Sequence, residues 1–479
     1  MRIIVALVLT AAASSLAAQT PRNPSEREAR DILAELVGIN TTYQHGSTTP
    51  AARAVARRFL DAGFPAGDVR VIGPDGDKDS NVVVRYPGSD ASLKPILLMA
   101  HLDVVEALRA DWSVDPFTLT EKDGFFYGRG TSDIKDGAAT LVEALLRMKR
   151  ERVRPRRTLV LMLTAGEEGG GGYNGASWLV RNHRDLVNAE LALNVDGGDP
   201  LLQHGKRVLR GVQSSEKLFQ SFWLEVTNPG GHSSRPRRDN AIVRLAAALT
   251  KVGAYEFPVH LNETTRGYFA RTAALATTEP ADAADMRAVA ASEHDSAAVA
   301  RLSRSIFYNA QLRTTCVPTM LEGGHAPNAL PQRARALVNC RILPGETPEE
   351  TRAALGRVVA DDSVRIAPID SALPAQPSPL SPLIMGAVHR VSDAMTPGLP
   401  IVPQMETGAT DGAQIRPAGI PTYGVSGVFL DVDDERAHGR DERIIAREFY
   451  DGTEFIYRLV RDLAGVPVGG GARAAGTRR

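Results

Sequence analysis

The sequence has little of what a membrane protein or a nucleic-acid-binding protein needs. Its 56 Lys and Arg residues are balanced by 56 Asp and Glu residues, so no excess of one charge favours nucleic acid or an anionic membrane as a partner. Beyond the N-terminus, no segment reaches about 18 uninterrupted apolar residues, so we expect no membrane-spanning helix in the mature chain. The 43% content of apolar residues is typical of a soluble globular protein.

Cysteine is also scarce. The two cysteines, Cys316 and Cys340, lack the CxxC spacing of a metal or redox motif. They lie in two strand-like runs joined by a loop, where a disulfide is sterically conceivable. Two free buried thiols are an equal alternative.

The first 18 residues have the pattern of a secretory signal peptide. Arg2 precedes an apolar stretch over residues 3–13, and Ser15, Leu16 and Ala17 supply a small-residue cleavage site. The stretch is too short for a stable membrane span, and a buried N-terminal helix is the alternative interpretation. We therefore expect an exported protein, periplasmic or secreted.

The 479 residues are too many for one hydrophobic core, and local patterns divide them. Strands alternate with helices over residues 19–212 and again over 371–465, which predicts an α/β domain with a mostly parallel central sheet. Residues 213–370 predict an inserted α+β domain with an antiparallel sheet, within which residues 275–300 form a helical or loose insertion. Residues 466–479 are expected to be a disordered tail.

Two helix starts are marked by capping boxes. Ser25 and Glu28 predict one N-terminus, and Thr347 and Glu350, with a proline between them at the first helical position, predict another.

Potential metal ligands follow three strand-like runs or lie in two polar loops. They are His101, Asp103, Glu167, Glu168 and Asp196 after the strands, and Asp133 and His438 in the loops. Because ligands bind at the carboxyl ends of strands in open α/β sheets, we expect these residues to meet at one edge of the sheet. Each residue alone is more often an ordinary polar side chain, but the whole ordered set is not expected by chance.

Mixed His and carboxylate ligands favour two Zn²⁺ ions, with Co²⁺ or Mn²⁺ as alternatives. Asp133 can bridge the pair, with His101 and Asp196 on one ion and Glu168 and His438 on the other. Three carboxylates and a bridging hydroxide nearly neutralise two divalent cations, as a partly buried site requires.

At this point the sequence resembles a known family. The motifs HLDVV, GRGTSDIKDG, the EE pair, NVDGG, GGHSSRP, NALP and AHGRDER, spread over about residues 30–460, resemble the M20 family of metallopeptidases. The family includes carboxypeptidases, dipeptidases and aminoacylases. The resemblance implies a di-metal aminopeptidase-like catalytic domain and an inserted lid and dimerisation domain, and hence a homodimer.

The resemblance also implies roles for residues of the catalytic domain. His101 resembles the first metal ligand, and Asp103 the carboxylate that orients it. Asp133 resembles the bridging aspartate, which in the family precedes a cis peptide bond. Glu167 resembles the general base, and Glu168, like Asp196 and His438, a metal ligand.

Other residues resemble the family's substrate-binding groups. His232 resembles a histidine that reaches the partner subunit's active site and stabilises the oxyanion. Asn328 and Arg341 resemble the pair that binds the substrate carboxylate, for which the arginine fork is suited. Gly408 and Thr410 belong to a loop that resembles the lining of the substrate pocket. Without the resemblance, His232 would be read as an ordinary loop histidine.

The sequence departs from its apparent relatives after the glutamate pair. Four glycines, residues 169–172, replace the acid and Gly-Ser that commonly follow. A phosphate-binding loop is an alternative interpretation, but no Gly-Lys-Ser/Thr follows the glycines. We expect instead that these glycines give the backbone beside the metal ligands conformational freedom.

These features together predict a zinc-dependent exopeptidase that acts on small peptides with a free C-terminal carboxylate. An N-acyl-amino-acid amidohydrolase on the same site is the alternative. A non-catalytic periplasmic binding protein is a third interpretation, but binding alone requires neither Glu167 nor Asp103.

Overall fold

The computed structural model describes residues 21–466 except 75–77, 170–171, 370–371, 373 and 375. The predicted signal peptide therefore lies outside the described residues, as does the predicted tail apart from Val466. No helix in the described part of the chain combines the length and hydropathy that crossing a bilayer requires.

The chain forms two compact units. Unit 1 comprises the residues up to Gln213, Pro379–Val402 and the residues from Thr410 onward, and unit 2 comprises Ser214–Ser378 and Pro403–Ala409. The short segment Pro403–Ala409, which the sequence analysis grouped with the catalytic domain, belongs to unit 2. The chain therefore passes between the units four times.

Unit 1 is built on a ten-stranded mixed sheet. In spatial order its strands are β1 (Val69–Ile72), β2 (Asn81–Tyr86), β6 (Leu159–Thr164), β3 (Ile96–His101), β7 (Leu191–Asn194), β17 (Thr422–Gly424), β9 (Lys206–Glu216), β8 (Leu201–Gln203) and β18 (Leu430–Asp431), with β16 (Ile401–Glu406) paired to β9. The central strands β6, β3, β7 and β17 are parallel, and β1, β2 and β9 pair antiparallel to their neighbours. The predicted α/β fold with a mostly parallel central sheet is confirmed.

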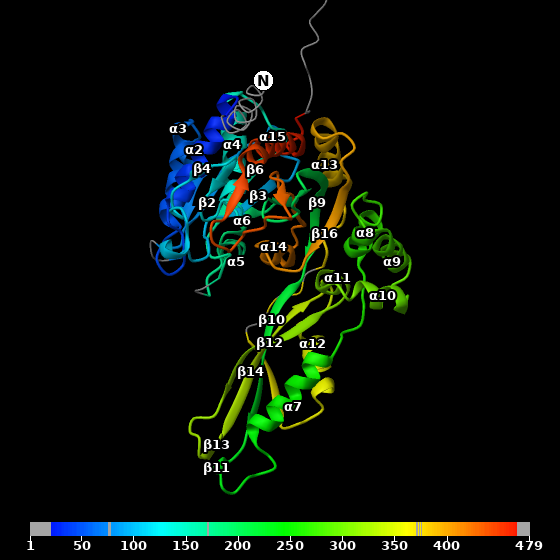
Figure 1. The fold of residues 1–479 in the computed structure, drawn as a ribbon. Helices are drawn as coiled ribbons and strands as arrows, with labels where there is room; N and C mark the ends of the chain where they lie inside the picture. Colours follow the sequence, from blue (N-terminus) through cyan, green and yellow to red (C-terminus); the bar gives the residue numbers. More distant parts are fainter. Residues whose placement is uncertain are drawn as a thin grey trace, which may run out of the picture. The chain divides into compact units, whose positions relative to one another are not determined.

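Helices cover both faces of this sheet (Figure 1). They are α2 (Pro24–Gly38), α3 (Thr49–Asp61), α4 (Lys135–Arg150), α13 (Pro382–Met395) and α15 (Ala446–Leu463) over one core, and α5 (Gly175–Asn182), α6 (Arg184–Val187) and α14 (Gly412–Ile415) over a smaller one. Leu98 of β3 faces the larger core, and its neighbours Leu97 and Met99 face the smaller one. Burial on both faces explains why the central strands are continuous apolar runs.

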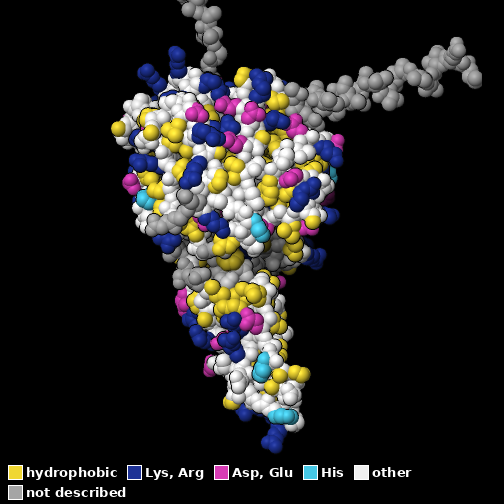
Figure 2. Space-filling model, turned by 90° about the vertical axis from the view of Figure 1, so that its left-hand side faces the viewer, with side chains coloured by type: hydrophobic (Ala, Val, Ile, Leu, Met, Phe, Trp, Pro, Cys, Tyr) yellow, Lys and Arg dark blue, Asp and Glu magenta, His cyan; other side chains and the backbone are white. Residues whose placement is uncertain are grey.

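A small sheet beside the main one consists of β19 (Arg443–Ile445), β5 (Phe125–Tyr127) and β4 (Thr120–Lys122). Three short 3₁₀ turns, at Ala66–Asp68, Arg109–Asp111 and Arg416–Ala418, complete the described elements of unit 1. On the face shown in Figure 2, basic and acidic side chains are interspersed over the described residues of unit 1. This mixture agrees with the zero net charge of the sequence.

One of the two predicted capping boxes is wrong. Helix α2 begins at Pro24, and its N-cap is Asn23, whose side chain accepts from the Glu26 backbone N–H at 2.9 Å. Proline at the first helical position fixes the N-cap at Asn23, two residues before Ser25. The box of Thr347 and Glu350 at the start of α12 (Pro348–Val359) is confirmed, with both reciprocal hydrogen bonds present.

Unit 2 contains an antiparallel four-stranded sheet, as predicted. Its strands, in spatial order, are β12 (Thr315–Gly323), β14 (Arg333–Ile342), β10 (Leu218–Thr227) and β15 (Val364–Ile369). Phe222, Leu224 and Val226 of β10 face a core that includes α7 (Ala241–Ala254) and α12. The alternate residues of β10, among them Phe219 and Trp223, therefore lie on the opposite face of the sheet.

The remaining parts of unit 2 are a helical insertion and a short hairpin. The insertion contains α8 (Glu263–Thr272), α9 (Pro280–Ala291), α10 (Ser296–Leu302) and α11 (Ile306–Leu312), and the hairpin pairs β11 (Gly231–His232) with β13 (Ala329–Leu330). Cys316 and Cys340 face each other across β12 and β14 and form a disulfide, so the first of the two sequence alternatives holds.

Candidate metal centre

Three strands of unit 1 end at the same edge of the sheet and present the predicted ligands. His101 is the last residue of β3 and is level with Thr164, the last residue of the parallel strand β6. Glu167 and Glu168 lie three and four residues beyond the end of β6, and Asp196 lies two residues beyond the end of β7, which runs parallel to β3. Parallel strands bring side chains remote in sequence to one edge, where α/β sheets bind ligands.

Asp133 lies between two imidazole rings. Its Oδ1 is 3.1 Å from His101 Nε2, and its Oδ2 is 2.9 Å from His438 Nε2. The two oxygens of one carboxylate thus face different rings, which is the arrangement that a bridging ligand needs. The peptide bond between Asp133 and Ile134 is cis, as the family resemblance implied.

Each imidazole has a second carboxylate beside it. Asp196 Oδ2 is 3.9 Å from His101 Nε2, and Glu168 Oε2 is 3.1 Å from His438 Nε2. Ligand atoms of His101, Asp133 and Glu168 all lie within 4.8 Å of one another. The structure therefore brings together the five predicted ligands as two groups that share Asp133.

Asp103 supports the glutamate pair more directly than it supports His101. Its Oδ1 and Oδ2 accept the backbone N–H groups of Glu167 and Glu168 at 3.2 and 3.0 Å. His101 Nδ1 lies 2.9 Å from the Asp103 backbone carbonyl but 3.9 Å from its carboxylate. The backbone of Asp103 thus orients the ring, while its side chain holds the turn that carries the base candidate and a ligand.

The turn after β6 depends on Gly166. Its φ is +79°, and a Cβ at this position would lie 2.3 Å from the Tyr173 carbonyl oxygen. Only glycine accepts both the left-handed φ and the close backbone. Gly169 and Gly172 also have positive φ, whereas the two glycines between them lie outside the described residues.

The electrostatics of the site favour bound cations. Burial, and then the charges of neighbouring carboxylates, raise the pKa of Glu167 and of Asp196 well above the usual range, although His101 opposes this. Hydrogen bonds to Asp133 and Glu168 raise the pKa of His438 to about 10. The side chains alone therefore hold more negative charge than the buried site tolerates, and divalent cations would offset it.

A buried carboxylate oxygen gives a second test of fit. Glu168 Oε1 is shielded from solvent and has no hydrogen-bond partner among the described residues. An unpartnered buried carboxylate oxygen costs free energy unless a ligand satisfies it. With two imidazoles and three carboxylates around it, the site fits a pair of divalent metal ions, and zinc suits this donor set.

Sequence reasoning assigned no role to Glu442, which organises the loop that presents Asp133. Glu442 is fully buried and accepts the backbone N–H groups of Gly130, Ser132 and Asp133 at 3.1, 2.8 and 3.2 Å. Arg129 Nη1 pairs with Glu442 Oε2 at 2.5 Å. Glu442 belongs to the AHGRDER motif, which the sequence analysis singled out for His438. Nothing in the sequence indicated which residues the Glu442 carboxylate contacts.

Arg129 extends the same support to His438. Its Nη2 donates to the Gly439 carbonyl at 2.9 Å and to the His438 carbonyl at 3.4 Å. His438 has a left-handed φ of +62°, which is costly for a residue other than glycine and persists only where neighbours fix it. The Arg129–Glu442 pair thus fixes the two loops that supply Asp133 and His438.

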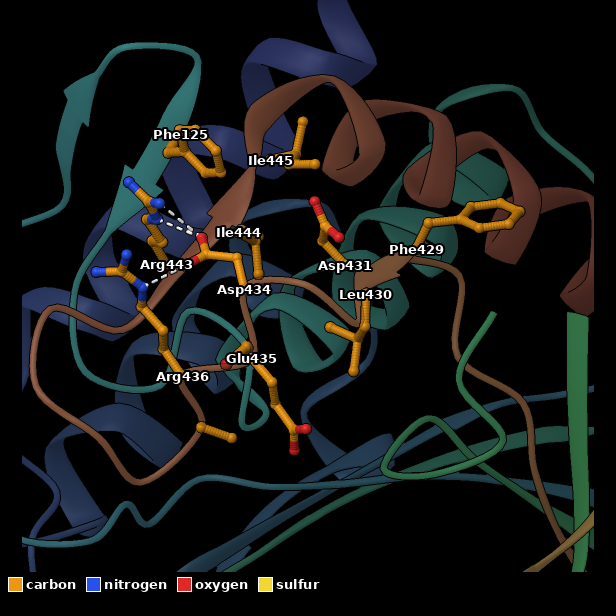
Figure 3. A pocket seen from close by; sticks show the side chains of 12 residues that line it. Phe125, Phe429, Leu430, Asp431, Asp434, Glu435, Arg436, Arg443, Ile444 and Ile445 are labelled. Carbon is orange, nitrogen blue, oxygen red and sulfur yellow. Dashed lines mark hydrogen bonds and ion pairs between the residues drawn. The ribbon is translucent and has the colours of Figure 1, made fainter. Parts of the chain in front are cut away.

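Asp434 fixes the rest of the loop that carries His438. Its carboxylate accepts from Arg436 Nε and Arg443 Nε, both at 2.7 Å, as the dashed lines in Figure 3 show. These side chains line a small pocket that also includes Ser132, next to Asp133, and Ala437, next to His438. Both ligand loops therefore border this pocket.

The loop that contains Gly408 and Thr410 is divided between the units. Thr410 is buried in unit 1, and its Oγ1 accepts from Asn194 Nδ2 at 3.1 Å. The same Asn194 Nδ2 donates to the Asp196 carbonyl at 3.1 Å, so this contact supports a ligand segment. Gly408 lies in unit 2, where its N–H donates to Glu406 Oε1 at 3.1 Å.

The predicted substrate-binding residues of unit 2 do not all lie together. His232 of β11 is exposed and pairs in register with Ala329, and Ser233 N–H donates to the Asn328 carbonyl at 3.0 Å. Arg341 lies at the other end of β14, eight residues beyond its first residue, Arg333. At about 3.3 Å per residue, Arg333 and Arg341 are about 26 Å apart along the strand. Within one chain, Asn328 and Arg341 therefore cannot hold the same carboxylate.

Comparison with known proteins identifies the family. The model of the family described as "Peptidase family M20/M25/M40" matches residues 97–462. The N-fatty-acyl-amino acid synthase/hydrolase PM20D1 of Homo sapiens is 30% identical over 445 residues, which cover 90% of this chain and 87% of that protein. The chain therefore belongs to this family of metal-dependent hydrolases.

Other relatives include a probable carboxypeptidase S-like 2 of Dictyostelium discoideum, 27% identical and covering 80% of this chain and 74% of that protein. Aminoacylase-1 of Homo sapiens is 26% identical and covers 80% and 84%. Among solved structures, an M20 family metallo-carboxypeptidase from Sulfolobus solfataricus has a TM-score of 0.67 at 15% identity, covering 92% of this chain and all of that one. The structural likeness supports the fold.

The Arg129–Glu442 pair yields a first prediction. Glu442→Gln removes the negative charge and leaves a buried guanidinium, so we expect a loss of about 3–5 kcal/mol in the free energy of unfolding. Because the loop presenting Asp133 loosens, we expect metal affinity to fall about 10- to 100-fold. Denaturant unfolding and competition titration with Zn²⁺ measure the two effects. Glu435→Gln, on an exposed residue of the neighbouring loop, is the control; equal behaviour of the two variants would contradict the assignment.

Proposed function

We propose that the protein hydrolyses the amide bond of N-acyl amino acids, using two divalent cations held in unit 1. The observation that carries this proposal is Asp133, whose two oxygens face His101 and His438, each with its own additional carboxylate. His101, Asp196 and Asp133 would hold one cation, and His438, Glu168 and Asp133 the other. When bound, such a pair lowers the pKa of water and polarises a carbonyl group.

Glu167 is the proposed general base. It directly follows the glycine turn and is adjacent to the ligand Glu168, but it forms no ion pair with either imidazole among the described contacts. Its carboxylate would take a proton from the attacking water and deliver it to the leaving amine of the amino acid. Burial, which raises the pKa of Glu167, favours this exchange because a carboxylate of ordinary acidity holds a proton poorly.

The substrate class rests on the relatives and on Arg341. A relative that matches nearly the whole chain is named for N-fatty-acyl-amino acids, which favours a long acyl chain on the amine side. Arg341 would bind the α-carboxylate of the amino acid. Peptides with a free C-terminus, which the sequence alone favoured, are the second candidate, supported by the carboxypeptidase S-like relative.

We further propose that the active form is a homodimer, because one chain cannot bring Asn328 to Arg341. In unit 2, the edge strand β12 exposes Val317, Met320 and Leu321 by 57%, 52% and 70%, and the start of α7 exposes Ile242 and Val243. An open strand edge with apolar side chains is a surface for pairing with a second copy. His232 and Asn328 would then come from one chain, and Arg341 with the cations from the other.

A substrate panel tests the activity. We expect the Zn²⁺-loaded protein to hydrolyse N-acyl amino acids, with kcat/KM rising with acyl length because more apolar surface is buried. Dipeptides should be poorer substrates, and chelator should abolish all turnover until Zn²⁺, Co²⁺ or Mn²⁺ is restored. Released amino acid, quantified by mass spectrometry, is the readout. Absence of turnover on both substrate classes by fully loaded protein would refute the proposal.

Glu167→Gln separates the base from the ligands. We expect kcat to fall by about 10²–10⁴-fold, because proton transfer loses its acceptor, while two metal ions per chain remain bound. Glu168→Gln is the matched comparison and should reduce metal content. Elemental analysis and steady-state kinetics give both quantities. If Glu167→Gln lost its metal, Glu167 would be a ligand and the assignment would be wrong.

Mixed dimers test the shared site. At a substrate concentration well below KM, His232→Ala and Arg341→Ala homodimers should each have little activity. When the two variant chains are co-expressed, about half of the dimers contain one chain of each kind. In such a mixed dimer, one of the two sites combines an intact Arg341 with an intact His232. We therefore expect the unseparated mixture to have about a quarter of wild-type activity. Two affinity tags isolate the mixed dimer. Inactive mixed dimers, or a fully active wild-type monomer, would contradict the dimer proposal.

A further inference from the structure

Two arginines of unit 2 lie over aromatic rings on the face of the sheet that is turned away from α7 and α12. Arg341 lies 4.7 Å from the centre of the Phe219 ring, and Arg335 lies 4.2 Å from the centre of the Trp223 ring. Both aromatic residues belong to β10 and both arginines to β14. The two pairs join the same strands in different registers: Phe219 is directly opposite Arg341, whereas Trp223 is opposite Leu337 and diagonal to Arg335.

The two arginines differ in how their charges are compensated. Arg335 forms a two-pronged ion pair with Glu322, at 2.7 Å from Nε and 3.2 Å from Nη2. Among the described residues, Arg341 has no hydrogen bond or ion pair, and its only close partner is the Phe219 ring. The fork of Arg341 is therefore available to an anion, whereas that of Arg335 is already used.

Arg341 is also the more buried of the two. Burial lowers the pKa of Arg341, and the charge of Glu406 opposes this effect. A guanidinium that has lost water without gaining a carboxylate partner costs free energy, and an arriving carboxylate recovers that cost. This environment favours an anion that binds in the plane of the guanidinium.

Phe219 is placed to hold that plane. It is the direct cross-strand partner of Arg341, and 50% of its surface is exposed, so its ring contributes little to the core. The Cζ atom of Arg341 lies over this ring, 4.7 Å from its centre, and such a contact restricts the long, flexible arginine side chain. A guanidinium held over a ring keeps N–H groups that can donate to a carboxylate.

We propose that Phe219 is a positioning residue that holds Arg341 ready for the substrate's α-carboxylate. This inference rests on the proposed function, since it assigns to Arg341 the carboxylate of the N-acyl amino acid. Phe219 acts through Arg341 and touches neither the cations nor the scissile bond. It is a determinant of specificity for substrates that carry a free carboxylate.

Variants of Phe219 test this inference on the Zn²⁺-loaded full-length protein. Phe219→Ala should raise KM for an N-acyl amino acid about 3- to 30-fold, the range expected for loss of one cation–π contact, with kcat changed less than about twofold. Phe219→Tyr keeps the ring and should behave as wild type. Phe219→Leu keeps apolar bulk without a π-face and should resemble Phe219→Ala, which provides a second variant if the alanine variant folds poorly.

Three controls make the result specific. Trp223→Ala removes the matching stack on Arg335 and should leave KM unchanged. The N-acyl amino acid amide, which lacks the carboxylate, should be hydrolysed equally by wild type and Phe219→Ala. In an Arg341→Ala background, Phe219→Ala should add no further increase in KM.

The outcomes also separate this inference from the proposed function. Wild-type protein that hydrolyses no acyl or peptide substrate would refute the proposed function. If wild type is active, an unchanged KM in both Phe219→Ala and Phe219→Leu would refute the inference. Equal loss on the acid and on its amide, or additive losses with Arg341→Ala, would likewise overturn it, since Phe219 would then act independently of the arginine.

Discussion

The metal centre depends on one buried ion pair, Arg129 with Glu442. Glu442 accepts three backbone N–H groups of the loop that presents Asp133, and Arg129 donates to the carbonyls of His438 and Gly439. Neither charge is stable alone in this interior, so the two loops can adopt their places only together. The ion pair thus holds the loop of Asp133 next to the loop of His438, although the two loops are far apart in sequence. Arg129 and Glu442 position the proposed ligands and are not ligands themselves.

That geometry concentrates negative charge where water has little access. Asp196 and Glu167 are neighbours of Asp133 and Glu168, and burial raises the pKa of the first two. Folding alone thus concentrates negative charge that the proposed cations would offset. Asp103 contributes through the turn, because its carboxylate fixes the backbone from which both glutamates project.

The sequence predicted the strands, which are apolar runs, and the polar residues that follow them. The apolar runs predicted the central sheet, and the polar residues at their ends supplied three of the five ligand candidates, because strand patterns and the carboxyl edge of a parallel sheet can be recognised from sequence. Asp133 and His438 were found in polar loops. Contacts between remote segments were beyond those rules. The sequence assigned no role to Glu442, and Asn328 and Arg341 were paired on the family resemblance, which does not show how far apart they lie in one chain. A β-strand between them separates them instead.

The position of β17 has a consequence for the order in which the protein can be made. This strand, Thr422–Gly424, lies between β7 and β9, although unit 2 is synthesised before it. At about 5–20 residues per second, the first half of the sheet must wait with unpaired central edges until β17 emerges from the ribosome. His438 emerges later still. A nascent chain that has not reached His438 therefore lacks one of the five proposed metal ligands.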